Sequence, residues 1–115
     1  MAARTKKTPP PVSEEALILI ASWFRTLAEP SRLKILRALE EGEKNITELV
    51  EATGLTQANV SRHLQTLTEA GILGRRKEGL SVIYFIVDPG IFDLCRHVCG
   101  SLKRRIEKHA EAFQV

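Results

Sequence analysis

A run of hydrogen-bonding side chains with few charges occupies residues 57–66. Gln, Asn, Ser, Thr and Arg can bond base edges in the major groove of DNA, whereas Glu and Lys dominate an ordinary solvated helix face. We expect this segment to contact DNA, although a single helix of this kind is also compatible with plain solvent-exposed surface. The predicted contact residues are Gln57, Ala58, Asn59, Ser61, Arg62, His63, Gln65 and Thr66.

Two cysteines could also do chemistry. Cys95 and Cys99 are four residues apart, so a helix would place them on one face about 6 Å apart. Two thiolates at that separation can share a soft metal or metalloid ion, and they could instead meet a reactive species that modifies thiols. The alternative stays open that both pack as small apolar residues, because both fall on an apolar stripe.

Three consecutive cations, Arg75, Arg76 and Lys77, lie on the first of two extended runs, 72–77 and 82–87. The turn between the runs contains glycine, so the two are predicted to pair as a hairpin. The charges could protect an edge strand from pairing with other chains. Beside a DNA-reading helix, we favour contacts to phosphates.

The elements that position these residues form a recognisable pattern. Thr56 is predicted to cap the helix that contains residues 57–66, and Gly71 to end it. His63 flanks the core side of this helix, as a structural residue or one near a phosphate. A short helix over 45–54 precedes it across a turn that contains glycine, which is the helix-turn-helix arrangement. The core-facing residues of the two helices are expected to be Ile46, Leu49, Val50, Val60, Leu64 and Leu67.

Two further predicted helices carry more apolar surface than one small domain can bury. The helix over 14–28 is apolar almost all round, and the one over 89–113 carries a long apolar stripe. We expect both to pack against a second copy of the chain. A helix over 30–41 contributes Leu33, Leu36 and Leu39 to the core.

Composition limits the class of protein. The 115 residues carry a net charge of +3, with 43% hydrophobic residues. This predicts one domain over residues 13–115, preceded by a disordered basic, proline-rich tail over 1–12. No apolar run could span a membrane and no signal peptide is visible, so we expect a cytoplasmic protein without a membrane partner.

Two other functional classes are less compatible with the residues. A thiol enzyme would need a cysteine at a helix start, or a Cys-x-x-Cys motif after a strand. A winged helix that binds only proteins would present an apolar outer face at 57–66 instead of a polar one.

Three motifs resemble the ArsR/SmtB family of bacterial winged-helix repressors: Leu27-Ala-Glu-Pro-Ser-Arg-Leu-Lys-Ile-Leu36, Gln57-Ala-Asn-Val-Ser-Arg-His-Leu64 and Glu69-Ala-Gly-Ile-Leu73. The resemblance covers about residues 16–113. It implies a mainly α fold with a small hairpin, in the order α-α-α-α-β-β-α, and a homodimer formed through the first and last helices. It also implies binding to a palindromic double-stranded DNA operator and release by an effector.

The effector sites of that family are only partly matched. Its arsenic site needs paired cysteines on the first helix of the helix-turn-helix, where this chain has none. Its persulfide sensor also needs a cysteine that residues 30–41 lack. Its zinc site corresponds to Asp93, Cys95, Ile106 and His109, and Ile106 cannot bind a metal. On the wing, Leu80 stands where the family often has arginine.

These patterns together predict a sequence-specific repressor whose effector acts on Cys95 and Cys99, with Asp93 and His109 as further candidate ligands. The alternative is a winged-helix regulator without metal or thiol sensing, in which the cysteines are structural.

Overall fold

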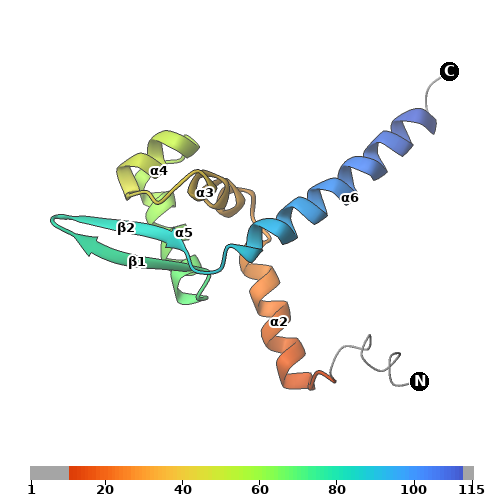
Figure 1. Ribbon diagram of the computed structural model, residues 1–115, viewed down its shortest axis with the longest axis horizontal. Helices are drawn as coiled ribbons and strands as arrows, with labels where there is room; N and C mark the ends of the chain where they lie inside the picture. The colour runs from red at the N-terminus through yellow and green to blue at the C-terminus, as the bar shows by residue number, and fades with distance from the viewer. Residues whose placement is uncertain (1–10, 113–115) are drawn as a thin grey trace.

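The computed structural model describes residues 11–112, which form five helices and one β-hairpin (Figure 1). This order confirms the predicted winged helix-turn-helix. Residues 1–10 of the predicted tail, and Phe113 at the end of the predicted last helix, lie outside the described residues. The elements in chain order are α2 (Glu14–Leu27), α3 (Pro30–Glu40), α4 (Ile46–Thr53), α5 (Gln57–Glu69), β1 (Leu73–Glu78), β2 (Ser81–Ile86) and α6 (Gly90–Ala112).

Capping residues near the helix ends determine where α4 and α5 begin and where α4 stops. Asn45 and Glu48 form a reciprocal capping box at the start of α4, with each side chain accepting from the other residue's backbone N–H. Gly54 ends α4 at a φ of 73°, a left-handed conformation that favours glycine. Thr56 then caps α5 by accepting from the N–H of Asn59. These local contacts set the tight turn between the two helices.

The hairpin is antiparallel and pairs Leu73 with Ile86 at one end and Glu78 with Ser81 at the other. Gly74 lies opposite Phe85, and a Cβ on Gly74 would come within 2.5 Å of the Phe85 ring. Glycine therefore lets the ring cross the neighbouring strand. Lys44 extends the sheet by one antiparallel bridge to Tyr84, which ties the hairpin to the segment before α4.

The core lies between α3, α4, α5 and the hairpin. Leu33 was predicted to face inward, and this is wrong: 41% of its surface is exposed. The buried face of α3 is instead formed by Ile35, Leu36, Ala38 and Leu39, while Leu33 lines an open groove beside α4. The predicted inner faces of α4 and α5 are confirmed by the buried residues Leu49, Val60, Leu64 and Leu67.

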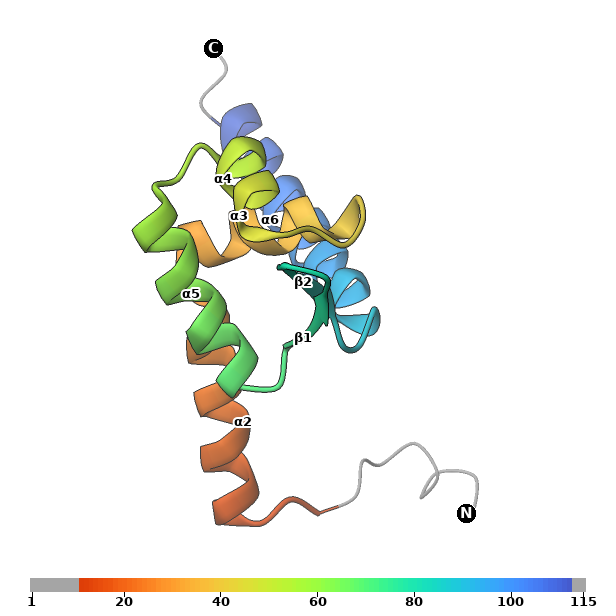
Figure 2. The same cartoon turned by 90° about the vertical axis from the view of Figure 1, so that its left-hand side faces the viewer.

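The first and last helices leave this body in different directions (Figures 1 and 2). Both have few close neighbours among the other elements. The radius of gyration is 18.2 Å, well above the roughly 13 Å expected of a compact chain of this length. Large apolar side chains are exposed along both helices, namely Leu17, Ile18, Leu19, Ile20, Phe24, Val98, Leu102 and Ile106.

Among residues 11–112, no helix combines the length and apolar character that a membrane crossing requires.

Candidate nucleic-acid interface

The outer face of α5 presents uncharged polar groups and one arginine to solvent. The Arg62 guanidinium donates to the Asn59 side-chain oxygen at 3.0 Å, and the Gln65 amide donates to Glu69 at 3.1 Å. Both contacts are exposed and lie within the helix, so an external acceptor can replace them. The exposed members of the predicted set are Gln57, Ala58, Ser61, Arg62 and Gln65, with Asn59 and Thr66 half-buried beside them.

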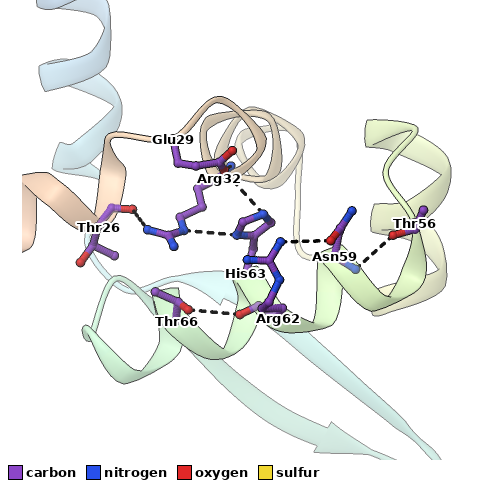
Figure 3. Close-up of polar contacts among 8 residues, drawn as sticks. All are labelled: Thr26, Glu29, Arg32, Thr56, Asn59, Arg62, His63 and Thr66. Atoms are coloured by element: carbon purple, nitrogen blue, oxygen red, sulfur yellow. Dashed lines mark hydrogen bonds and ion pairs between the residues drawn. The ribbon is translucent and has the colours of Figure 1, made fainter.

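His63 was predicted to contact DNA, and this is wrong, because its side chain is not on the exposed outer face of α5. The residue is only 3% exposed, because it lies on the core side of α5 next to Leu64. Its Nδ1 accepts from Nε of Arg32 at 3.2 Å, and its Nε2 lies 3.5 Å from a Glu29 carboxylate oxygen (Figure 3). This position agrees with the prediction that His63 is a structural residue on the core side of the helix.

The surroundings of His63 favour the neutral ring. Burial lowers the pKa of His63, and the charges of Arg62 and Arg32 lower it further, against the opposing charge of Glu29. Because Nδ1 accepts a hydrogen bond, the proton of the neutral ring is on Nε2, where it faces Glu29. Glu29 also accepts from the N–H of Arg32 at 2.9 Å and thereby caps α3.

The three cations of β1 differ in their surroundings. Arg76 donates to Glu43 at 2.6 Å, pairs with Glu78 and lies over the Phe85 ring. The hydrogen bond from Arg76 lowers the pKa of Glu43. This arginine therefore already anchors the hairpin to the loop before α4, which the sequence did not reveal. Arg75 and Lys77 are exposed, and no ion pair of either is present within residues 11–112.

The tip of the hairpin carries Leu80 as a fully exposed side chain. Gly79 beside it has a φ of 61°, which makes the turn tight enough to project Leu80. The wing is therefore basic along β1 and apolar at its end.

The two cysteines lie on one helix, as predicted, but differ in exposure. Cys95 is half-buried against the core, whereas Cys99 is exposed. Within residues 11–112 of one protomer, no group of three His, Cys, Asp or Glu side chains could hold a metal ion. Asp93 instead pairs with Arg96 at 2.6 Å, and His109 lies roughly 24 Å further along the same helix.

Arg96 also donates to Glu40 at 2.8 Å, which attaches α6 to the end of α3. Residues of α3 thus contact both the cysteine-bearing helix and, through Arg32, the polar helix α5. Neither Glu29 nor Arg32 was predicted from the sequence as a functional residue, although both lie in the motif over 27–36. The sequence offers little to identify them, because their contact partner His63 lies about 31 residues further along the chain.

Comparison with known proteins places this geometry among bacterial regulators. A family model described as bacterial regulatory protein, arsR family, matches residues 29–74. A probable mercury resistance operon repressor of Streptomyces lividans is 40% identical over 74 residues, which cover 64% of this chain and 59% of that protein. The matching region thus spans less than two thirds of that relative.

Solved structures agree with the sequence matches. The uncharacterized HTH-type regulator Rv0081 of Mycobacterium tuberculosis is 39% identical over 71% of this chain and 73% of its own. Its crystal structure superposes with a TM-score of 0.77, covering 85% of this chain and 99% of that one at 34% identity. A homodimeric winged helix-turn-helix DNA-binding domain of Mycobacterium bovis superposes with a TM-score of 0.73 over 89% of this chain and 96% of its own, at 28% identity.

Proposed function

This chain belongs to the ArsR family of bacterial regulatory proteins, which are DNA-binding transcriptional regulators, and we propose that it is a homodimeric repressor of a palindromic operator. The observation that carries the proposal is the outer face of α5. Its exposed Gln57, Ser61, Arg62 and Gln65 offer donors and acceptors suited to base edges, on the second helix of a helix-turn-helix. The exposed Arg75 and Lys77 supply contacts to phosphates.

A second copy of the chain is the partner that the apolar helices require. Leu19 of α2 is 71% exposed and Ile106 of α6 is 66% exposed, and neither helix packs broadly on its own protomer. The M. bovis domain with the same fold is homodimeric. Two α5 helices related by two-fold symmetry can enter successive major grooves on one face of the duplex when they lie about 34–36 Å apart.

For the effector, we propose a soft metal or metalloid ion that binds Cys95 and Cys99. The pair fits such an ion because one thiol is exposed and the other lies one helical turn away. Within one protomer the set stops at two ligands, so further ligands would come from the partner copy, with Asp93 and His109 as candidates. The relative from S. lividans is described as a mercury resistance operon repressor, which supports a soft ion.

Binding of an ion by the two cysteine thiols would change the proposed subunit interface itself. Cys95 and Cys99 lie on α6 beside the exposed apolar positions Val98 and Leu102. Each thiol must lose its proton to bind the ion, so charge changes at this surface. An ion that binds one arrangement of the two copies more tightly shifts the dimer toward it. The operator would then be released if the distance between the two α5 helices in that arrangement does not match the spacing of successive major grooves.

Selection from random DNA tests the DNA-binding proposal. Purified protein should enrich duplexes with two inverted half-sites whose centres are one helical turn apart. Enrichment of a single half-site would contradict the dimeric operator, and no enrichment over input would contradict sequence-specific binding.

Release from the selected operator tests the effector proposal. Fluorescence anisotropy should show release by Hg(II), As(III) or Cd(II) from the wild type, and none from Cys95→Ser or Cys99→Ser at equal operator affinity. Release of the double variant at the same ion concentration would mean that the cysteines are structural. Release of the operator by a thiol oxidant, and by none of these ions, would mean that the effector is a thiol-modifying species instead of a metal ion.

A further inference from the structure

The beginning of α3 connects the end of α2 to α5 through a single side chain. Nη1 of Arg32 donates to the backbone oxygen of Thr26 at 3.0 Å, while its Nε donates to Nδ1 of His63 (Figure 3). The carbonyls in the last turn of a helix have no partner within the helix, so the Thr26 oxygen is available for this bond. Arg32 therefore bonds α2 and α5 at the same time.

Few other contacts define the angle between these two helices. Helix α2 has sparse contacts with the rest of the protomer beyond its buried end at Leu27 and the half-buried Trp23, which packs against the core. A guanidinium group is planar and holds its donors in a fixed fork. Two bonds from one fork to α2 and α5 consequently constrain their relative direction more than one flexible contact would.

We propose that Arg32 and His63 are positioning residues that set the angle between α2 and the DNA-reading helix α5. The proposal rests on the proposed function, in which α2 lies at the subunit interface. Neither side chain needs to touch DNA, since Arg32 is half-buried and His63 is buried. Through this contact, a shift of one subunit against the other changes the spacing of the two α5 helices.

The contact requires a neutral His63, because a protonated Nδ1 cannot accept from Arg32. The charged groups that face the ring are Glu29 and Arg32 from α3 and Arg62 from α5, and α2 contributes only the Thr26 carbonyl through Arg32. Operator affinity of the wild type should therefore fall on acidification. Added positive charge alone would strengthen binding to phosphates instead.

A pair of matched variants tests the positioning role. Arg32→Gln removes the fork, whereas Arg37→Gln removes the same charge from an exposed position on the same helix. Spin labels at positions 15 and 69, in a Cys95→Ser/Cys99→Ser background diluted with unlabelled chain, report the distance from α2 to α5 within one chain. We expect Arg32→Gln to broaden or shift this distance and to weaken operator binding about tenfold. Arg37→Gln should leave both unchanged.

The label distance is measured within one chain and without DNA, so the two proposals can fail separately. An unchanged α2–α5 distance in Arg32→Gln would overturn the positioning role. A wild type that selects no operator, with the distance still dependent on Arg32, would overturn only the proposed function.

Two substitutions of His63 separate positioning from packing. His63→Asn keeps an acceptor near the Nδ1 position, while His63→Leu fills the buried space without one. Asn should retain the wild-type distance and remove the loss of operator affinity on acidification, and Leu should behave like Arg32→Gln. Equal behaviour of the folded Asn and Leu variants would overturn the proposal.

Discussion

At the scale of single residues, neighbouring side chains of α5 have opposite surroundings. Arg62 is exposed, while His63 next to it is buried and bonded to α3. Each residue turns about 100° around the helix axis, so a continuous polar run cannot all face one groove. The set of side chains that can read bases is thus smaller than the polar composition of 57–66 suggests.

Arg62→Ala should remove a base contact. We expect a loss of about 1–3 kcal/mol in operator binding that is concentrated at particular base pairs, with Gln65→Ala as a weaker case. Anisotropy measurements over a set of single-base operator variants would show relaxed preference at those positions.

Arg75→Ala provides the contrast, because an exposed cation on β1 is suited to phosphates. It should weaken all sequences alike and reduce the slope of log K against log salt by about 1. Arg76→Ala should have a smaller effect on that slope, since Arg76 is already paired with Glu43 and Glu78. Identical profiles for Arg62→Ala and Arg75→Ala would contradict this division of roles.

His63 should make stability depend on pH. Its pKa in the folded chain is below the ordinary value of 6.5, so the unfolded chain binds the proton more readily. The free energy of unfolding should therefore decline as pH falls below about 6.5 and be unaffected by this group at higher pH. Urea denaturation at a series of pH values measures this dependence. Below about pH 6.5 the free energy of unfolding should change more steeply with pH in the wild type than in His63→Asn, and above it the two slopes should be equal.

At the scale of elements, the sequence predicted the helices well because their ends are encoded locally. The Asn45 capping box, Gly54 and Thr56 each act within a few residues of their own position. Contacts between elements were not predictable in the same way. The pairing of Arg76 with Glu43 joins residues 33 apart, and Arg32 reaches His63 across 31. Which cations remain available for DNA depends on such distant pairs.

Gly74→Ala tests the hairpin as a unit. The new methyl group would collide with the Phe85 ring, and moving that ring also disturbs the Arg76 side chain that lies over it. We expect a loss of about 1–3 kcal/mol in the free energy of unfolding, measured by urea denaturation. Adding Phe85→Leu removes the colliding ring atoms and should recover part of the loss. A Gly74→Ala protein as stable as wild type would show that the ring moves aside freely.

At the scale of the whole molecule, the exposed stripe of α6 should control both assembly and DNA binding. Leu102→Glu or Ile106→Glu places a charge on that stripe and should give a monomer without operator binding at roughly 10 μM protein. His97 is exposed on the opposite side of α6, so His97→Glu adds the same charge away from the stripe and should leave the dimer intact. Light scattering distinguishes the species, and a monomeric wild type would remove the basis of the proposal.

The exposed apolar faces of α2 and α6 should also make the stability of the protein depend on its concentration. If a second copy covers these faces, folding and pairing are one equilibrium, and the melting temperature should rise with protein concentration. Calorimetry over a hundredfold dilution series would show this. Newly made chains at low copy number would then spend more time unfolded and open to proteolysis, so abundance itself would determine how long each molecule survives.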